Sequence, residues 1–232
     1  MNATSIGAMQ NGEYELRGKR LSDLMATSDV VSVAWLAWTG REPSQAEHEV
    51  LRAMFVACVD HGTEPPSASV TRTVASCGKP LADSVAAGLL TLGPRHGNAC
   101  GLASLWMREA VEGKQAAESV VDAALAEKRR LPGLGHPEYD VDPRTMALKE
   151  IAKKQLPATP HLDFAFEVAR IFSDKKGKPL PLNIDGALGA LIADMNAPAE
   201  VADAIFLVAR SIGLSAHALE EAEQSSSYRR GV

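Results

Sequence analysis

The chain has 232 residues, of which 46% are hydrophobic and 23% charged, so it can bury one sizeable core without disulfides or metal. The formal net charge of −5, with no basic face or arm, argues against a nucleic-acid binder. The three cysteines show no CxxC spacing, and no signal peptide or run of about 18 apolar residues stands out, so we expect reduced thiols, no membrane span and a cytoplasmic protein.

Helical patterns follow one another along most of the chain. Residues 1–12 are polar and aperiodic, and we expect a flexible arm there. Asp29 can cap a helix that ends near Gly40, and Ser44 with Glu47 has the spacing of a capping box. The other predicted helices span residues 68–76, 81–92, 97–112, 116–129, 143–154, 161–172, 186–195, 198–212 and 213–224.

Few segments have the alternation of a strand. The best candidate, residues 180–184, is too isolated to build a sheet. Aromatic residues are scarce at 5% and alanine is frequent, which favours closely packed helices. The helices at 81–92 and 186–195 are apolar on nearly all faces and should lie inside the body. The sequence therefore predicts an all-α fold.

Three histidines lie in loops beside glycines, namely His61, His96 and His136. Such glycines let the backbone approach a ligand, and an imidazole there can act as acid, base or donor near neutral pH. Asp185 precedes Gly186 at a predicted helix start, where a carboxylate is often only an N-cap. Each of these residues taken singly is more often structural, but together they indicate a catalytic site.

Two other clusters of polar residues carry weaker signals. The histidines lack the HxxxH spacing of a zinc site, so no metal is predicted. The run Lys128-Arg129-Arg130 is interpreted as a solvated helix end rather than part of a groove. No Walker or GxGxxG sequence is present, so neither ATP nor a nicotinamide is expected.

Several segments, in order, resemble the motifs of the citrate synthase superfamily. They are Asp60-His61-Gly62 with Ser67-Ala68-Ser69, Gly93-Pro94-Arg95-His96-Gly97, Pro132-Gly133-Leu134-Gly135-His136 with Asp142-Pro143-Arg144, Leu182-Asn183-Ile184-Asp185-Gly186, Ala209-Arg210-Ser211-Ile212-Gly213 with Ala216-His217, and Tyr228-Arg229. In length the chain is most similar to the citryl-CoA lyases and to the terminal module of ATP-citrate lyase. The resemblance implies a citrate synthase-like multi-helix domain over residues 13–232, with a larger helical body and a small helical lobe at about 101–195. It also implies a homodimer or higher homo-oligomer.

The resemblance assigns roles to particular residues. Asp185 matches the base that removes or returns a methyl proton of a CoA thioester, and His96 matches the donor to the thioester oxygen. His136 matches the acid for the oxo group of the second substrate, and it accepts the hydroxyl proton in cleavage. The residues that match contacts to the oxo acid are His61, Arg144, Arg210 and Arg229, the last of which reaches a neighbouring subunit in the family.

Coenzyme A, carried in as an acyl-CoA, is the one cofactor that the resemblance implies. The glycine-rich loop resembles the segment that binds adenine, through Leu131, Gly133, Leu134 and Gly135. Lys176 and Lys178, with Lys175, could meet the phosphates, or they could form a solvated basic loop.

We therefore expect a citryl-CoA lyase-like enzyme that cleaves citryl-CoA to acetyl-CoA and oxaloacetate through an enolate. One alternative is a synthase that condenses an acyl-CoA with a 2-oxo acid, and another is a non-catalytic CoA-binding subunit. Two departures from the family pattern bear on the substrate: Pro137-Glu138 stand where Arg often follows the histidine, and Asn98-Ala99-Cys100-Gly101 stand where Gly-Ala-Asn-Glu is common.

Overall fold

The computed structural model describes residues 4–10, 12–224 and 228. These residues form eleven helices and one small sheet, so the predicted all-α class is confirmed. The elements in chain order are β1 (Gly7–Gln10), β2 (Glu13–Leu16), β3 (Lys19–Arg20), α1 (Leu21–Thr27), α2 (Val30–Thr39), α3 (Gln45–Cys58), α4 (Pro66–Ser76), α5 (Leu81–Leu89), α6 (Cys100–Glu112), α7 (Ala117–Ala126), α8 (Pro143–Gln155), α9 (Pro160–Lys176), α10 (Ile184–Asp194) and α11 (Glu200–Gln224).

The predicted helix starts near residues 30 and 44 are confirmed. The Asp29 carboxylate accepts a hydrogen bond of 2.9 Å from the backbone N–H of Ser32. Ser44 and Glu47 form both hydrogen bonds of a capping box, at 3.2 and 2.8 Å. These side chains satisfy backbone donors that a helix start would otherwise leave without partners.

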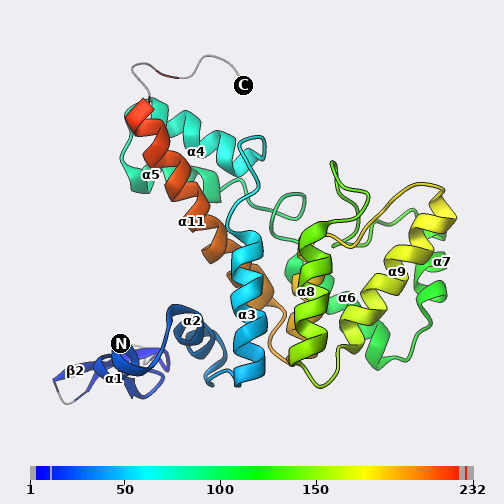
Figure 1. Ribbon diagram of the computed structural model, residues 1–232, viewed down its shortest axis with the longest axis horizontal. Helices are drawn as coiled ribbons and strands as arrows, with labels where there is room; N and C mark the ends of the chain where they lie inside the picture. Colours follow the sequence, from blue (N-terminus) through cyan, green and yellow to red (C-terminus); the bar gives the residue numbers. More distant parts are fainter. Residues whose placement is uncertain (1–3, 11, 225–227, 229–232) are drawn as a thin grey trace.

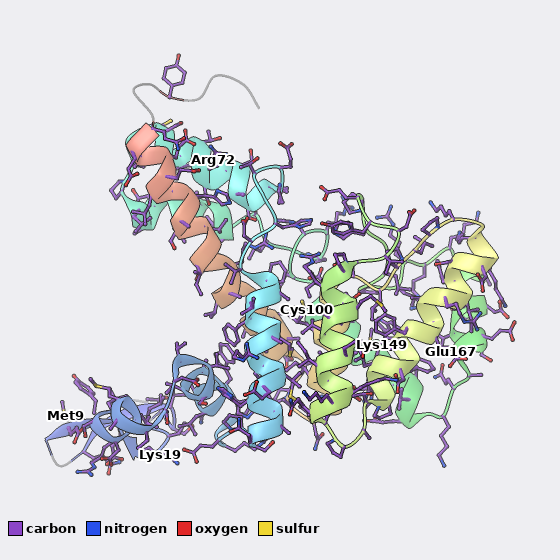
Figure 2. The ribbon with its side chains drawn as sticks, in the orientation of Figure 1. Met9, Lys19, Arg72, Cys100, Lys149 and Glu167 are labelled. Atoms are coloured by element: carbon purple, nitrogen blue, oxygen red, sulfur yellow. The ribbon has the colours of Figure 1, made fainter. Side chains whose placement is uncertain are left out.

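The loose arm predicted for residues 1–12 is wrong for residues 7–10, which form strand β1. The three strands pair antiparallel in the order β1-β2-β3 and project from the helical body (Figure 1). β1 is exposed along its whole length, and Met9 at its far end is labelled in Figure 2. The sheet is tied to the body by Arg17, whose guanidinium donates two hydrogen bonds of 2.8 and 3.0 Å to the carbonyl oxygen of Ala37.

Helix α10 lies at the centre of the core. Nine of its eleven residues are buried, as its apolar sequence predicts, and it packs against α3, α6, α8, α9 and α11. One continuous hydrophobic cluster joins residues of these helices to Trp35 of α2. A second cluster lies between α7 and α9 and includes Leu131. The proposed boundary of a small lobe at about 101–195 stays a prediction, because the main cluster spans it.

The helices predicted at 198–212 and 213–224 are in fact one helix, α11. Gly213 does not end it, because the glycine is needed for packing: a Cβ there would collide with the carbonyl oxygen of Val59. Among the described residues, α11 is the helix long and apolar enough to cross a membrane, but half of its most apolar window is buried within the fold. It packs on α3, α4, α5 and α6, and buried core helices of this kind pass the same test.

Candidate active site

A cavity of about 1040 Å³ opens between the loop at residues 131–137, the start of α10 and the end of α9. Asp185 and His136 line it, and so do all the residues proposed to bind CoA: Leu131, Gly133, Leu134, Gly135, Lys176 and Lys178. The volume lies at the upper end of the usual range for small-molecule sites. The structure thus brings two of the three predicted catalytic residues and the whole predicted CoA set to one cavity.

The glycine-rich loop is fixed to the segment that leads into α10. Gly133 and Gly135 have φ angles of +89° and +90°, which favour glycine. The Gly133 carbonyl accepts a 3.0 Å hydrogen bond from Asn183 N–H, and Gly135 N–H donates to the Pro181 carbonyl at 2.8 Å. A Cβ at Gly133 would lie 2.5 Å from the Cα of Gly186. The loop backbone therefore lies directly against the first turn of α10, next to Asp185.

Asp185 lies in the first turn of α10 but does not cap it. Asn183 is the N-cap, and its side chain accepts a 3.1 Å hydrogen bond from Gly186 N–H while donating one of 2.8 Å to the Gly135 carbonyl. The Asp185 carboxylate is therefore not needed to cap the helix, and it accepts a 3.3 Å hydrogen bond from the Cys100 thiol. Burial raises the pKa of Asp185, which makes its carboxylate a stronger base than an exposed one.

Cys100 starts α6 in the interior and has no exposed surface (Figure 2). Burial and the neighbouring Asp185 carboxylate raise the pKa of its thiol well above the ordinary value. The thiol therefore keeps its proton and acts as a donor to Asp185. Sequence reasoning noted this position as a departure from the family but did not connect it with Asp185.

The ring of His136 is held in a defined orientation by its own loop. Its Nδ1 accepts hydrogen bonds from the backbone N–H groups of Glu138 and Tyr139, at 3.1 and 3.2 Å. Because burial lowers the pKa of His136, the ring is neutral, and the two N–H donors at Nδ1 assign its proton to Nε2. The Arg144 guanidinium lies 3.5 Å from Nε2. His136 thus presents a neutral N–H donor beside a fixed cation.

Arg144 is itself fixed by a buried carboxylate. Its guanidinium donates hydrogen bonds of 3.0 and 2.7 Å to the two oxygens of Asp142, which is fully buried. Burial works against ionisation of Asp142, but the hydrogen bonds from Arg144 hold the pKa of Asp142 below its usual value. The pair is therefore charged, and Arg144 is rigid enough to bind a carboxylate with defined geometry.

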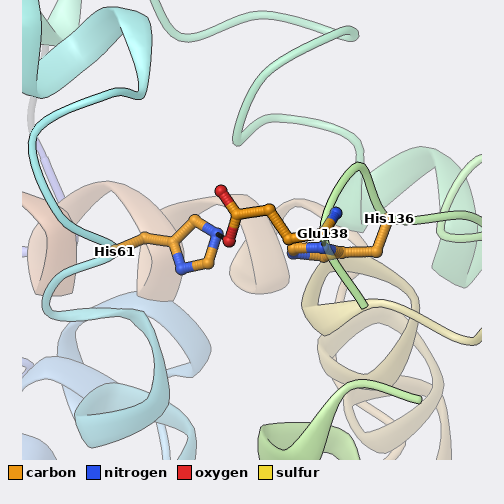
Figure 3. A group of neighbouring side chains, drawn as sticks. All are labelled: His61, His136 and Glu138. Carbon is orange, nitrogen blue, oxygen red and sulfur yellow. Dashed lines mark hydrogen bonds and ion pairs between the residues drawn. The ribbon is translucent and has the colours of Figure 1, made fainter. Parts of the chain in front are cut away.

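His61 comes from the loop after α3 and meets His136 edge to face, with 5.3 Å between ring centroids. Figure 3 shows the Glu138 side chain between these two histidines, with Glu138 Oε2 3.8 Å from His61 Nε2. Burial, followed by the charge of Arg144, lowers the pKa of His61. A second contact joins this loop to helix α11, where Asp60 accepts a 2.9 Å hydrogen bond from His217.

His61, His136 and Glu138 also bring one metal-ligand atom each within 4.8 Å of one another. The spacing argument against zinc did not consider this group, because its members come from two separate loops. Two features of the geometry argue against a metal there: the proton of His136 is on Nε2, and the Arg144 cation lies 3.5 Å from that nitrogen. The absence of a metal site stays a prediction, and we interpret the two histidines of this group as contacts to an anionic substrate.

His96 lies against the start of α4 instead of lining the cavity. Its Nε2 is 3.4 Å from the backbone nitrogen of Ser67 and 3.0 Å from Ser67 Oγ. A backbone N–H can only donate, so Nε2 is the acceptor and the neutral ring carries its proton on Nδ1. Burial and the charges of Arg210 and His61 lower the pKa of His96, which places these groups within electrostatic reach of it.

Arg210 enters the site from the middle of α11, and only 3% of it is exposed. Its Nε donates a 3.0 Å hydrogen bond to the Cys58 carbonyl, and its guanidinium lies 5.0 Å from the ring centroid of Phe206. Burial lowers the pKa of Arg210, but the group stays a cation at neutral pH. Its charge also acts on His61, His96 and Asp185. Arg229, the remaining predicted contact, lies outside the described residues.

Basic residues surround the outer part of the cavity. They are Arg95, Lys128, Arg129, Arg130, Lys176 and Lys178. The run Lys128-Arg129-Arg130 is exposed directly after α7, as expected for a solvated helix end, but the expectation that it is not part of a groove was wrong, because the same residues line the cavity. Lys175 belongs elsewhere, since its amino group forms ion pairs of 3.0 and 2.5 Å with Glu118 and Asp122. Arg95 lies within the motif Gly93-Pro94-Arg95-His96-Gly97, but no role was predicted for it.

The chemistry available to this arrangement is limited and specific. A basic carboxylate on α10, two neutral imidazole donors on separate loops and two fixed guanidinium groups on α8 and α11 make up the site. A carboxylate with a raised pKa can move a proton to or from carbon, while an imidazole N–H stabilises charge on an oxygen. The outer basic residues suit a phosphate-bearing ligand. Such a site fits an enzyme that forms or breaks a bond next to the carbonyl of a nucleotide-linked substrate.

The family model described as "Citrate synthase, C-terminal domain" matches residues 28–230. The chain therefore belongs to the citrate synthase family, which confirms the resemblance found in its motifs.

Solved structures give closer comparisons. The citryl-CoA lyase from Hydrogenobacter thermophilus is 36% identical, superposes with a TM-score of 0.93, and is matched over 100% of this chain and 91% of that chain. An ATP citrate lyase from Methanosaeta concilii, solved in complex with (3S)-citryl-CoA, is 28% identical with a TM-score of 0.92, over 100% of this chain and 40% of that one.

A curated relative, a probable ATP-citrate synthase from Dictyostelium discoideum, is 30% identical over 206 residues, which is 82% of this chain. The chain spans about a third of that relative's length.

Proposed function

We propose that the protein is a citryl-CoA lyase, which cleaves citryl-CoA to acetyl-CoA and oxaloacetate. The observation that carries the proposal is the cavity itself, because it has Asp185 and His136 on one side and six basic residues around its outer part. The similarity to a citryl-CoA lyase along nearly all of both chains supports it further. The enzyme would then be a carbon–carbon lyase that uses CoA as part of its substrate.

In this proposal Asp185 handles the proton on carbon. Breaking the carbon–carbon bond of citryl-CoA leaves the enolate of acetyl-CoA, and this carbon must receive a proton. A carboxylic acid with a raised pKa holds a proton at a higher pH than an exposed one, and can therefore deliver it. In the reverse direction the same group, now ionised, removes a methyl proton.

The two neutral histidines would serve the two oxygens. His96, with its proton on Nδ1, would donate to the thioester oxygen, where the negative charge of the enolate develops. His136 would act through Nε2 on the oxygen that is a hydroxyl in citryl-CoA and an oxo group in oxaloacetate. In condensation Nε2–H would give its proton to the oxo oxygen, and the Arg144 cation at 3.5 Å and the two N–H donors at Nδ1 would stabilise the imidazolate that is left. In cleavage this imidazolate would take the hydroxyl proton back while Asp185 gives its own proton to carbon.

The carboxylates of the oxo acid would bind to Arg144, Arg210 and His61. Arg144 is fixed by Asp142 and Arg210 by the Cys58 carbonyl, so neither guanidinium has to be ordered when the ligand arrives. Arg229 would complete the set from a neighbouring subunit. We accordingly propose a homodimer or higher homo-oligomer, which is supported by exposed apolar side chains along α11: Leu207, Ile212 and Leu219. We also propose a cytoplasmic location.

For the CoA end, the double variant Arg130→Gln/Lys178→Gln is expected to bind CoA about tenfold more weakly, because each exposed cation contributes modestly to phosphate binding. The loss should shrink at high salt. Isothermal titration with CoA measures it. Arg170→Gln, which removes a cation from another part of α9 outside this cavity, is the control, and an equal loss in that variant would contradict the assignment.

The thiol of Cys100 should set the pH dependence of cleavage. Asp185 must hold a proton to return it to carbon, so activity should fall as the pH rises through its pKa. Cys100→Ala removes a donor that stabilises the carboxylate and should move this fall to higher pH, whereas Cys100→Ser supplies a stronger donor and should move it to lower pH. The measurement is kcat/KM for citryl-CoA against pH. Identical profiles for all three proteins would show that the thiol does not influence the base.

Two alternatives remain open to a direct assay. The same groups can run condensation, so the protein could act as a synthase of citrate or a related acid, or it could bind CoA without catalysis. Purified protein is supplied with citryl-CoA in one reaction, and with acetyl-CoA and oxaloacetate in another, with Asp185→Ala as control. Oxaloacetate release in the first reaction, without free thiol in the second, supports the lyase. Free thiol in the second supports the synthase, and inactivity in both with CoA still bound supports the binding subunit.

A further inference from the structure

Glu138 takes part in the site in two ways. Its backbone N–H donates to His136 Nδ1 at 3.1 Å, so its main chain helps to orient that ring. Its side chain extends toward the other histidine, and Oε2 comes within 3.8 Å of His61 Nε2 (Figure 3). A carboxylate is thus placed beside a residue that the proposed function assigns to a carboxylate of the substrate.

The contact between Glu138 and His61 does little for the fold. At 3.8 Å it is longer than a hydrogen bond, and more than half of the Glu138 side chain surface is exposed. The pKa of His61 is lowered by its burial, so the ring is mostly neutral at pH 7 and the attraction is weak. A structural role therefore does not account for the position of the carboxylate.

The surrounding charges show what Glu138 opposes. Of the two guanidinium groups nearby, Arg144 is already neutralised by the buried carboxylate of Asp142. An incoming dicarboxylate therefore meets a site whose positive charge is partly offset, with one more negative charge at its edge. The backbone of the loop fixes Glu138 there, because Glu138 N–H and Tyr139 N–H both bond to His136.

We propose that the Glu138 carboxylate occupies the place of a substrate carboxylate at His61 while the site is empty, and lowers the affinity for the oxo acid. This inference rests on the proposed function, because it takes His61, Arg144 and Arg210 as the oxo-acid contacts. In a lyase, the consequence is faster release of oxaloacetate, because the returning Glu138 carboxylate competes with the product for the same place at His61. Glu138 is therefore a residue that sets the affinity for the product and reduces inhibition of cleavage by oxaloacetate.

The test is isothermal titration of oxaloacetate, at low ionic strength with EDTA, into the wild type, Glu138→Gln and Asp140→Asn. Glu138→Gln should bind oxaloacetate about fivefold more tightly, the effect of one unit charge about 4 Å away in a watery environment. Asp140 is an exposed acid two residues further along the same loop, and its removal should change the affinity by less than about 1.5-fold. CoA affinity should be the same in all three proteins, because Glu138 is not among the residues that line the CoA cavity.

Several results would overturn this proposal. Equal oxaloacetate affinities for the wild type and Glu138→Gln would show that the carboxylate does not compete. A gain in Asp140→Asn as large as in Glu138→Gln would show a general effect of net charge, and an equal gain in CoA affinity would place the effect at the other ligand. If the wild type binds CoA but no oxaloacetate, the oxo-acid site itself is wrong, and the inference fails with it.

Discussion

Asp185→Asn is expected to slow the cleavage of citryl-CoA by about 10²–10⁴-fold, the usual loss when one general acid–base group is removed. The amide has nearly the same shape as the carboxylate but can neither take nor deliver a proton, so the enolate carbon has no proton donor. CoA binding should stay within about twofold of the wild type, because the basic residues proposed to bind the phosphates are untouched. Initial rates with citryl-CoA and titration with CoA measure the two effects.

The stability of the same variant provides its control. Burial raises the pKa of Asp185, so the ionised form costs the folded state free energy, and that cost appears as the pH rises through the folded pKa. A neutral amide avoids it. The Tm at pH 7 should therefore be equal to or higher than that of the wild type. A loss of rate together with a Tm lower by several degrees would point to misfolding, and an unchanged rate would remove Asp185 from the mechanism.

The second large effect is expected for Gly133→Ala. A Cβ at this position would lie 2.5 Å from Gly186 Cα and 2.9 Å from Gly186 nitrogen, so either the loop or the first turn of α10 must move. Displacement of that turn moves Asp185, and errors of about 1 Å can cost about 10²-fold in rate. The unfolding free energy should fall by about 2–5 kcal/mol, from backbone strain and overpacking together.

Gly135→Ala separates these two causes. The backbone at Gly135 has φ of +90°, against +89° at Gly133, but the nearest atom to its Cβ would be Leu180 Cδ2 at an ordinary 3.4 Å. It should therefore show the strain, about 1–2 kcal/mol, without the collision. Denaturant unfolding and cleavage rates are measured for both variants. If the two lose stability and rate equally, the close approach of Gly133 and Gly186 has no special role.

Most helices could be predicted because their signals are local. The caps at Asp29 and Ser44 and the apolar runs need no knowledge of distant contacts. The N-terminal sheet was missed even though Asn11-Gly12 is a strong hairpin signal in the sequence, because exposed strands lack an apolar face to mark them. The break predicted at Gly213 failed for the opposite reason, since that glycine serves a contact with Val59, which is remote in sequence.

The site was predictable where family motifs identify residues, and less so where function depends on tertiary position. The placement of the glycine-rich loop, Asp185 and His136 at one cavity agrees with the prediction. The basic run at Lys128-Arg129-Arg130 follows a helix end, and only the tertiary structure shows that it also lines the cavity. Likewise, the contact of Glu138 with His61 joins loops more than seventy residues apart.

Asn183 gives the two halves of the site a common support. Its amide nitrogen donates a hydrogen bond to the Gly135 carbonyl of the glycine-rich loop, and its amide oxygen caps α10, the helix that carries Asp185. In the proposed function, a single side chain therefore sets both the position of the nucleotide and the position of the base. Binding energy from the adenine and phosphates, which do not react, can in this way help to position the carbon that exchanges a proton with Asp185. A short thioester without the nucleotide should therefore show a lower kcat as well as weaker binding.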